Sequence, residues 1–197
     1  DVLGSRGLGD VYKRQTMIRE HAAEWHVDPD AIAVIGFSAG GHLAANLATS
    51  TSDDVLVAHG YDPDAVRPNG LMLAYPVITS GPLAHRGSFD SLLGERRNDS
   101  QALESVSIER HIDAKTPPVF AWHTVPDETV PYENTLMLID ACKKAGVSIE
   151  AHLFPQGGHG LSLGTAETAW QGVNGIEPSI QIWPQLAVSW MRRTFAR

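Results

Sequence analysis

A short apolar run leads directly into a serine between two glycines, and a helical pattern begins at once. Ala31–Gly36 (AIAVIG) is continuously apolar and partly β-branched, which is typical of a buried parallel strand. The stretch Gly36-Phe37-Ser38-Ala39-Gly40 satisfies the pattern G-x-S-x-G. Apolar residues then recur at helical spacing over Ser38–Ala48. A strand, a tight turn and a helix in immediate succession predict a unit of an α/β fold.

The alternation of strands and helices continues towards the C-terminus. Short apolar runs predict further strands at Gly70–Tyr75, Pro118–His123 and Ser148–Phe154. Helices are predicted from Thr16 with Ile18, Ala22 and Trp25 on one face, between Pro131 and Gly146, and over Trp183–Phe195 with Trp183, Leu186, Ala187, Trp190 and Met191 facing inward. Strands that alternate with helices imply crossover connections, so we expect a mostly parallel sheet with helices on both faces.

Two long segments interrupt this alternation. Thr79–Thr116 is polar and partly helical, and Gly164–Ile182 is rich in glycine and polar residues. In a parallel sheet, long loops at the carboxyl ends of strands are usual places for a lid or a substrate wall. We therefore expect a lid-like insertion at about residues 79–116.

Composition narrows the class of protein. A length of 197 residues predicts one domain, and 43% apolar with 19% charged residues is enough to bury a core. The formal charge of −8 disfavours a nucleic-acid partner or an anionic membrane surface, because both need a clustered basic patch. The longest apolar stretches are far shorter than the roughly 20 residues that span a bilayer. Cys142 is the single cysteine, which excludes an internal disulfide and a Cys-based zinc site.

The first fifteen residues differ from the rest of the chain. Asp1–Gln15 (DVLGSRGLGDVYKRQ) has no clear helical or strand period, and its tail resembles translated sequencing-adapter sequence. We interpret it as a non-native or disordered leader, with a flexible native loop as the alternative, and place the domain at 16–197. The segment has no secretory signal pattern, which favours a cytoplasmic protein. A leader of foreign origin implies a missing native N-terminus and so leaves export open.

Ser38 is the candidate nucleophile. In a nucleophile elbow the serine occupies a strained strand-to-helix turn, so the flanking positions must be small. The following helix points its N-terminal N–H groups at the oxygen of a tetrahedral intermediate, and Ala39 N–H is the predicted oxyanion donor. A glycine-rich turn that binds phosphate or only packs tightly is the alternative. The position directly between a predicted strand and a predicted helix favours the elbow.

A serine nucleophile needs a histidine base and an acid that holds the base. In elbow-type hydrolases the acid and then the histidine follow the serine along the chain. Asp127 follows the strand at Pro118–His123 and is the predicted acid, with the neighbouring Glu128 as the competing candidate. His159 lies between two glycines after the strand at Ser148–Phe154 and is the predicted base.

The other histidines are expected to have different roles. His123 ends a strand, which favours a packing role or a role in the acid loop, and His42 lies in the helix after Ser38, which favours a hydrogen-bonded structural role. The remaining histidines have no partner spacing that points to catalysis. Because the sequence contains no H-E-x-x-H pair, it predicts no zinc hydrolase and no metal site.

These residues lie in segments that resemble the acetyl-esterase and feruloyl-esterase branch of the α/β-hydrolases, a xylan-esterase-like group. The matching segments are HAAEWHVDPDAIAVIGFSAGGHLAA (His21–Ala45), LAYPVI (Leu73–Ile78), HRGSFDSLLGE (His85–Glu95), PPVFAWHTVPDETVPYENTLML (Pro117–Leu138) and FPQGGHGL (Phe154–Leu161). The resemblance implies Ser38 as nucleophile, Asp127 as acid, His159 as base and no cofactor. It also implies removal of small acyl groups, typically acetyl, so the expected partner is a small-molecule ester such as an acylated carbohydrate.

The resemblance further implies a partial fold. Members of this group have an earlier half with several strands and a H-G-G loop that gives the second oxyanion donor, and Asp1–Gln15 contains no such loop. We therefore expect a partial α/β-hydrolase fold without its N-terminal strands, in which Ala39 is the one oxyanion donor. The strand at Ala31–Ile35 would then be an unpaired apolar edge.

Two other functions stay open at this point. A prolyl-oligopeptidase-like serine peptidase shares the elbow, the order of the three residues and the fold. The other alternative is a catalytically inert truncated fragment or binding remnant of the fold. The sequence predicts no oligomeric state.

Overall fold

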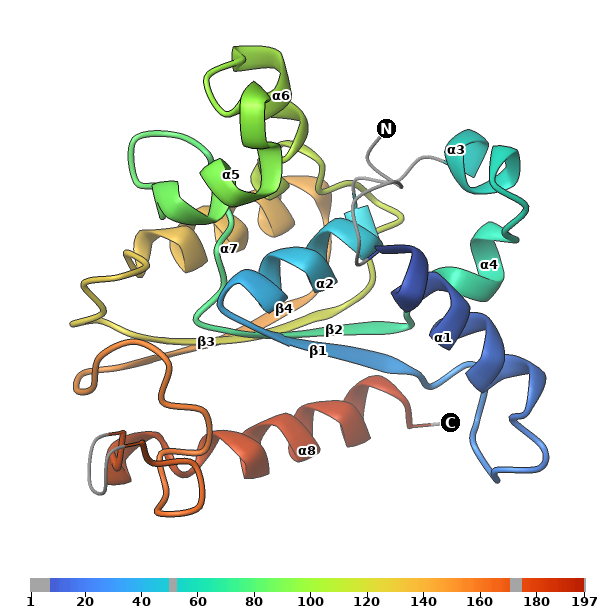
Figure 1. The fold of residues 1–197 in the computed structure, drawn as a ribbon. Helices are drawn as coiled ribbons and strands as arrows, with labels where there is room; N and C mark the ends of the chain where they lie inside the picture. Colours follow the sequence, from blue (N-terminus) through green and yellow to red (C-terminus); the bar gives the residue numbers. More distant parts are fainter. Residues whose placement is uncertain (1–7, 50–52, 171–174, 197) are drawn as a thin grey trace.

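Four strands form one parallel sheet in the order β1-β2-β3-β4 (Figure 1). The structure is a computed structural model and describes residues 8–49, 53–170 and 175–196. The strands are β1 (Ala33–Phe37), β2 (Gly70–Ala74), β3 (Val119–Thr124) and β4 (Ile149–Phe154). All neighbouring strands pair in parallel. The predicted parallel sheet and its four predicted strands are confirmed.

Helices cover both faces of this sheet, with α2 and α7 on one face and α8 on the other (Figure 1). The α-helices are α1 (Leu8–Glu20), α2 (Ala39–Thr49), α3 (Asp53–Ala58), α4 (Pro63–Val66), α5 (Arg86–Leu93), α6 (Ser100–Ser105), α7 (Glu133–Ala145) and α8 (Trp183–Thr194). Short 3₁₀ helices are η2 (Gly94–Arg96), η3 (Ile108–Arg110) and η4 (Pro178–Ile180). Gly146 ends α7 with φ +73, as its predicted place just past the helix requires.

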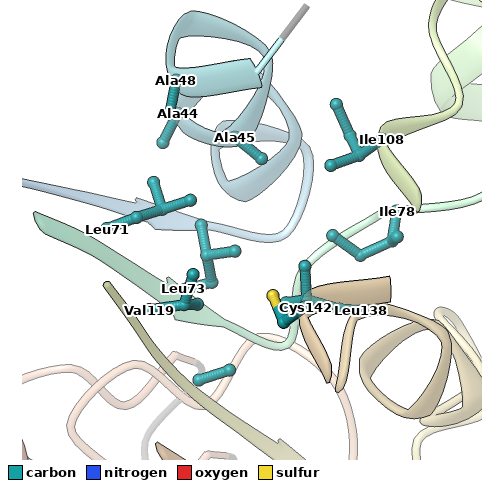
Figure 2. Packing of buried hydrophobic residues seen from close by; sticks show 11 residues of the cluster. Ala44, Ala45, Ala48, Leu71, Leu73, Ile78, Ile108, Val119, Leu138 and Cys142 are labelled. Carbon is teal, nitrogen blue, oxygen red and sulfur yellow. The ribbon is translucent and has the colours of Figure 1, made fainter. Parts of the chain in front are cut away.

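The alternation of side chains along β2 and β3 builds two cores. Leu71 and Leu73 of β2 face α2 and α7, where small alanines of α2 and Cys142 of α7 let the helices approach the sheet closely (Figure 2). On the other face, Trp122 of β3 belongs to an aromatic core with Trp183 and Trp190 of α8. All five residues that were predicted to face inward from α8 pack in this second core.

β1 is an edge strand of the described sheet, because it pairs with β2 alone. Ile35 at its centre is 45% exposed, so the predicted buried strand is only half-buried. The exposure follows from the missing neighbour on one side of β1 within the described residues. This arrangement agrees with the expectation of an apolar edge at this strand.

The predicted leader is wrong in one respect, because α1 begins at Leu8 and residues 8–15 are helical. Tyr12 is fully buried and packs with Leu47, Leu56 and Val66, which fixes this part of the chain on α2 and α4. The segment lacks a clear helical period, so its sequence did not indicate that Tyr12 would be buried. Residues 1–7 lie outside the described residues, and a foreign origin of the segment stays a prediction.

The predicted helix from Thr16 also ends earlier than expected. α1 stops at Glu20, and a turn follows in which Trp25 is 44% exposed and stacks on His21 with ring centroids 5.0 Å apart. His26 adopts φ +54, which a continuing helix cannot contain. Trp25 therefore does not face the core, whereas Ala22 is buried as predicted.

The polar insertion at residues 79–116 contains α5, η2, α6 and η3. Phe89 and Val106 of this insertion form a small core with Val77 and Val130. The insertion therefore packs on the segments that follow β2 and β3, and its action as a lid stays a prediction. None of the helices within the described ranges is both long and apolar enough to cross a membrane.

Candidate active site

Ser38 occupies the turn between β1 and α2 with φ +54, a left-handed conformation that serine rarely adopts. Its N–H donates to the carbonyl of Ala74 at 3.0 Å, and the N–H of Val77 donates to the Ser38 carbonyl at 3.2 Å. These two bonds tie the turn to the end of β2 and hold the strained residue in place. The local geometry is that of the predicted nucleophile elbow.

The glycines around Ser38 differ in how much space a side chain would have. A Cβ on Gly36 would overlap the carbonyl oxygen of Gly40, and a Cβ on Gly41 would lie 2.9 Å from Cβ of Pro76. Gly40 itself has open space where a Cβ would lie. The expectation that both flanking positions must be small therefore holds for Gly36, whereas on the helix side the crowding falls on Gly41.

The structure brings Ser38, His159 and Asp127 into one hydrogen-bonded chain. Ser38 Oγ lies 2.7 Å from His159 Nε2, and His159 Nδ1 lies 2.6 Å from Asp127 Oδ2. The three residues follow β1, β4 and β3, so the carboxyl ends of three parallel strands deliver them to one edge of the sheet. With the His159 proton on Nδ1, Nε2 is free to accept the Ser38 hydroxyl proton.

Asp127 is buried and receives hydrogen bonds at both carboxylate oxygens. Oδ1 accepts from the backbone N–H groups of Thr129 and Val130 at 2.9 Å each, and Oδ2 accepts from His159 and from His123. Burial by itself raises the pKa of Asp127, but the hydrogen bonds from His123, His159 and Val130 together hold that pKa well below its usual range. Asp127 is thus ionised at neutral pH.

The competing acid Glu128 is exposed, and its neighbour Asp127 is the carboxylate that contacts His159. The loop that carries His159 is held by the Thr124 hydroxyl, which donates to the Gly158 carbonyl at 3.1 Å. Gly157 and Gly160 in this loop have φ +101 and +76, so both need the conformational freedom of glycine.

Tyr75 is a residue of this site that sequence reasoning missed. Its ring stands nearly edge-on to the His159 imidazole, with centroids 5.0 Å apart and an interplanar angle of 69°. Its backbone has φ +39, and its hydroxyl oxygen accepts the N–H of Ser162 at 3.1 Å. Burial raises the pKa of the Tyr75 hydroxyl. The available signal was the aromatic residue directly before Pro76, where a strand ends beside the elbow.

The two histidines that were expected to have structural roles are both buried and hydrogen-bonded. His42 Nε2 lies 2.7 Å from the carbonyl oxygen of Val106, and burial lowers the pKa of His42. This bond links α2 to the insertion. His123 Nε2 lies 3.2 Å from Asp127 Oδ2, so the expected role in the acid loop is the one that the geometry supports.

Ala39, the predicted oxyanion donor, is the first residue of α2 and is exposed. The N–H groups of a first helical turn have no acceptor within the helix, so this N–H can bind a ligand oxygen near Ser38. Trp122 is buried in the aromatic core and cannot stack against a substrate, whereas Trp170 is 46% exposed. Burial raises the pKa of the Cys142 thiol to about 11, in keeping with a small buried apolar residue.

Comparisons with known proteins agree with this geometry. The family model BD-FAE matches residues 7–141, a range that reaches into the predicted leader. The chain is 33% identical over 172 residues to "Endo-1,4-beta-xylanase B" of Butyrivibrio fibrisolvens, covering 86% of this chain and 27% of that protein. It is 30% identical over 162 residues to "Acetylxylan esterase" of Xylanibacter ruminicola, covering 80% of this chain and 32% of that protein.

A solved structure gives the same result for the fold. The acetyl ester-xyloside bifunctional hydrolase of Caldicellulosiruptor lactoaceticus superposes with a TM-score of 0.79 at 35% identity, covering 96% of this chain and 66% of that one. The chain spans between about a quarter and a third of the length of the two curated relatives named above. The family model, the relatives and the fold agree, and the chain belongs to the BD-FAE family of α/β-hydrolase esterases.

Proposed function

We propose that this chain carries the catalytic residues of a serine carboxylester hydrolase. The observation that carries the proposal is the continuous chain Ser38 Oγ–His159 Nε2 and His159 Nδ1–Asp127 Oδ2, at 2.7 and 2.6 Å. A nucleophile activated by a base, which in turn is held by an acid, is the arrangement that acyl transfer needs. The names of the relatives, which include an acetylxylan esterase, support an ester rather than an amide substrate.

The proposed reaction proceeds through an acyl-enzyme. Ser38 Oγ attacks the ester carbonyl while His159 Nε2 takes its proton, and His159 then returns this proton to the leaving alcohol. A water molecule that His159 deprotonates hydrolyses the acyl-enzyme and restores Ser38. Asp127 stays ionised throughout and stabilises the imidazolium that forms in both steps.

Ala39 N–H is the proposed oxyanion donor on this chain. The positive end of α2 lies beside Ser38, so charge that develops on the carbonyl oxygen is stabilised there. A single donor leaves much of the stabilisation to other groups, because loss of one oxyanion donor costs about 10²–10³ in turnover in a well-studied case. We expect slow turnover of activated esters wherever Ala39 acts alone.

The proposed substrate class is a small acyl ester, such as an acetylated carbohydrate. Support comes from the relatives, two of which are named for acetyl esters or acetylxylan. Comparing p-nitrophenyl acetate, an acetylated xylo-oligosaccharide and an aminoacyl p-nitroanilide separates this proposal from a serine peptidase. Faster cleavage of the anilide than of either ester would overturn the ester assignment.

The nucleophile is tested by Ser38→Ala together with labelling by a fluorophosphonate, which reacts only with an activated serine. Wild-type protein should be labelled and should hydrolyse p-nitrophenyl acetate, and Ser38→Ala should lose both. Ser100→Ala, at an exposed serine of α6, is the matched control and should keep both. Labelling that persists in Ser38→Ala contradicts the assignment, and unlabelled wild-type protein supports the inert alternative.

A further inference from the structure

His123 is a buried polar side chain with hydrogen-bond partners at both ring nitrogens. It lies at the end of β3 with no exposed surface, four residues before Asp127. Nδ1 lies 2.8 Å from the hydroxyl of Thr135 in α7, and Nε2 lies 3.2 Å from Asp127 Oδ2 and 3.0 Å from the carbonyl oxygen of Val130. The ring therefore joins the strand, the acid loop and the following helix.

These partners determine where the proton of the neutral ring lies. An ionised carboxylate and a backbone carbonyl only accept hydrogen bonds, so Nε2 of His123 has to be the donor to both. Nδ1 then accepts the hydrogen of the Thr135 hydroxyl, which is itself fully buried. One tautomer satisfies all three partners, and the other would set the Nε2 lone pair against two acceptors.

The second donor on Oδ2 of Asp127 matters because this oxygen also contacts His159. With His123 at 3.2 Å and His159 at 2.6 Å, Oδ2 is held between two imidazoles, while two backbone N–H groups hold Oδ1. A carboxylate fixed at both oxygens cannot rotate away from His159. The ionisable groups that face it are His123 from β3, His159 from the loop after β4, and Tyr75 after β2.

We infer that His123 is a positioning residue: it donates Nε2–H to Asp127 Oδ2 and so keeps this carboxylate aimed at His159. It contacts no reacting atom and acts only through Asp127. The inference rests on the proposed function for its effect on rate, but the contact with Asp127 stands by itself. Thr135 has a supporting role, because its hydroxyl fixes the tautomer of His123.

Two substitutions at His123 distinguish the loss of its hydrogen-bond donor from the loss of its side-chain volume. His123→Leu removes the donor and keeps an apolar group in the space, whereas His123→Gln returns an N–H at a similar reach. With fluorophosphonate as the probe, His123→Leu should be labelled about 10- to 100-fold more slowly than wild type at neutral pH, because a misplaced catalytic group loses rate on this scale. His123→Gln should recover most of this loss.

The pH dependence of labelling gives a readout that a purely structural role would not move. Loss of the Nε2–H donor raises the pKa of Asp127 and leaves its carboxylate free to turn away from His159, which weakens its stabilisation of the His159 imidazolium. The weaker contact moves the acid limb of the labelling profile to lower pH in His123→Leu. A limb that stays at its wild-type position, or a Gln variant as slow as the Leu variant, overturns the inference.

His42→Leu is the matched control, since it also removes a buried imidazole that is hydrogen-bonded to a backbone carbonyl, but one that does not contact Asp127. It should lower the melting temperature without moving the acid limb. An equal shift of the limb in both Leu variants would mean that loss of any buried histidine has this effect, and would overturn the inference.

Nuclear magnetic resonance tests the contact without reference to activity. In ¹⁵N-histidine-labelled wild-type protein, neutral His123 should carry its proton on Nε2, and the ¹³C carboxyl signal of Asp127 should titrate at higher pH in His123→Leu. A proton on Nδ1, or an unchanged Asp127 titration, overturns the inference. If wild-type protein is not labelled by fluorophosphonate yet passes both of these tests, the proposed function fails while the positioning of Asp127 by His123 stands.

Discussion

The low pKa of Asp127 links one carboxylate to the stability of the whole domain. An aspartate whose pKa is lower in the folded than in the unfolded state binds protons more weakly when folded. Its stabilising contribution is complete above its unfolded pKa of about 4 and is lost as pH falls from there towards the folded pKa. We predict that the difference in unfolding free energy between wild type and Asp127→Asn is unchanged from pH 6 to about pH 4 and narrows from there to pH 3 in urea titrations. A constant difference over this range would contradict the lowered pKa.

Tyr75 offers a second prediction at the scale of single residues. Tyr75→Phe keeps the ring that stands edge-on to His159 but removes the acceptor of the Ser162 N–H. Loss of this hydrogen bond should lower the unfolding free energy by about 1 kcal/mol. The rate at which Ser38 is labelled should change little. Tyr75→Leu removes the aromatic edge as well and should slow the labelling. Urea unfolding and fluorophosphonate kinetics on the two variants check this, and equal labelling rates in Phe and Leu variants would argue against a role for the ring.

At the scale of elements, the elbow between β1 and α2 makes opposite predictions for two glycines. Gly36→Ala puts a methyl group into the Gly40 carbonyl oxygen, so we expect no folded protein or a large loss of stability. In Gly40→Ala the added methyl group meets open space in the first turn of α2, so we expect no loss of stability. In a helix interior, alanine is favoured over glycine by about 1 kcal/mol. Thermal unfolding of the two variants decides the matter. A Gly40→Ala variant as unstable as Gly36→Ala would contradict the described turn.

The elements also show what sequence patterns can and cannot predict. The strands, α2, α7 and α8 were predictable because each buries a regular stripe or a continuous apolar run, and a tight turn follows β1. Ser38, Asp127 and His159 could be proposed because each follows a strand, and parallel strands end at one edge of the sheet. The local pattern only favoured Asp127 over Glu128, and it is Asp127 that the structure places in contact with His159.

The failures have physical causes as well. Tyr12 orders the start of α1 by packing with Leu47, Leu56 and Val66, and no local pattern contains those partners. Trp25 looked like a core residue from its spacing, but α1 ends at Glu20, so Trp25 lies in the turn that follows the helix and is exposed. Tyr75 lies beside His159 only because β2 is the neighbour of β1, which is a property of the sheet and not of the local sequence.

At the scale of the whole molecule, β1 forms one edge of the described sheet, and we expect this edge to promote self-association. An apolar edge strand offers unpaired backbone groups to another chain, and Ile35 adds an exposed apolar side chain at that edge. We predict that Ile35→Lys lowers the self-association of the protein, because a lysine on an edge strand opposes strand pairing and Ile35 contributes little to the core. Light scattering against concentration measures the effect. Val57→Lys, at an apolar residue of α3 that is 62% exposed, is the matched control, since it adds the same charge away from the sheet. A reduction of equal size in both variants would assign the effect to net charge, whereas a reduction confined to Ile35→Lys locates self-association at β1.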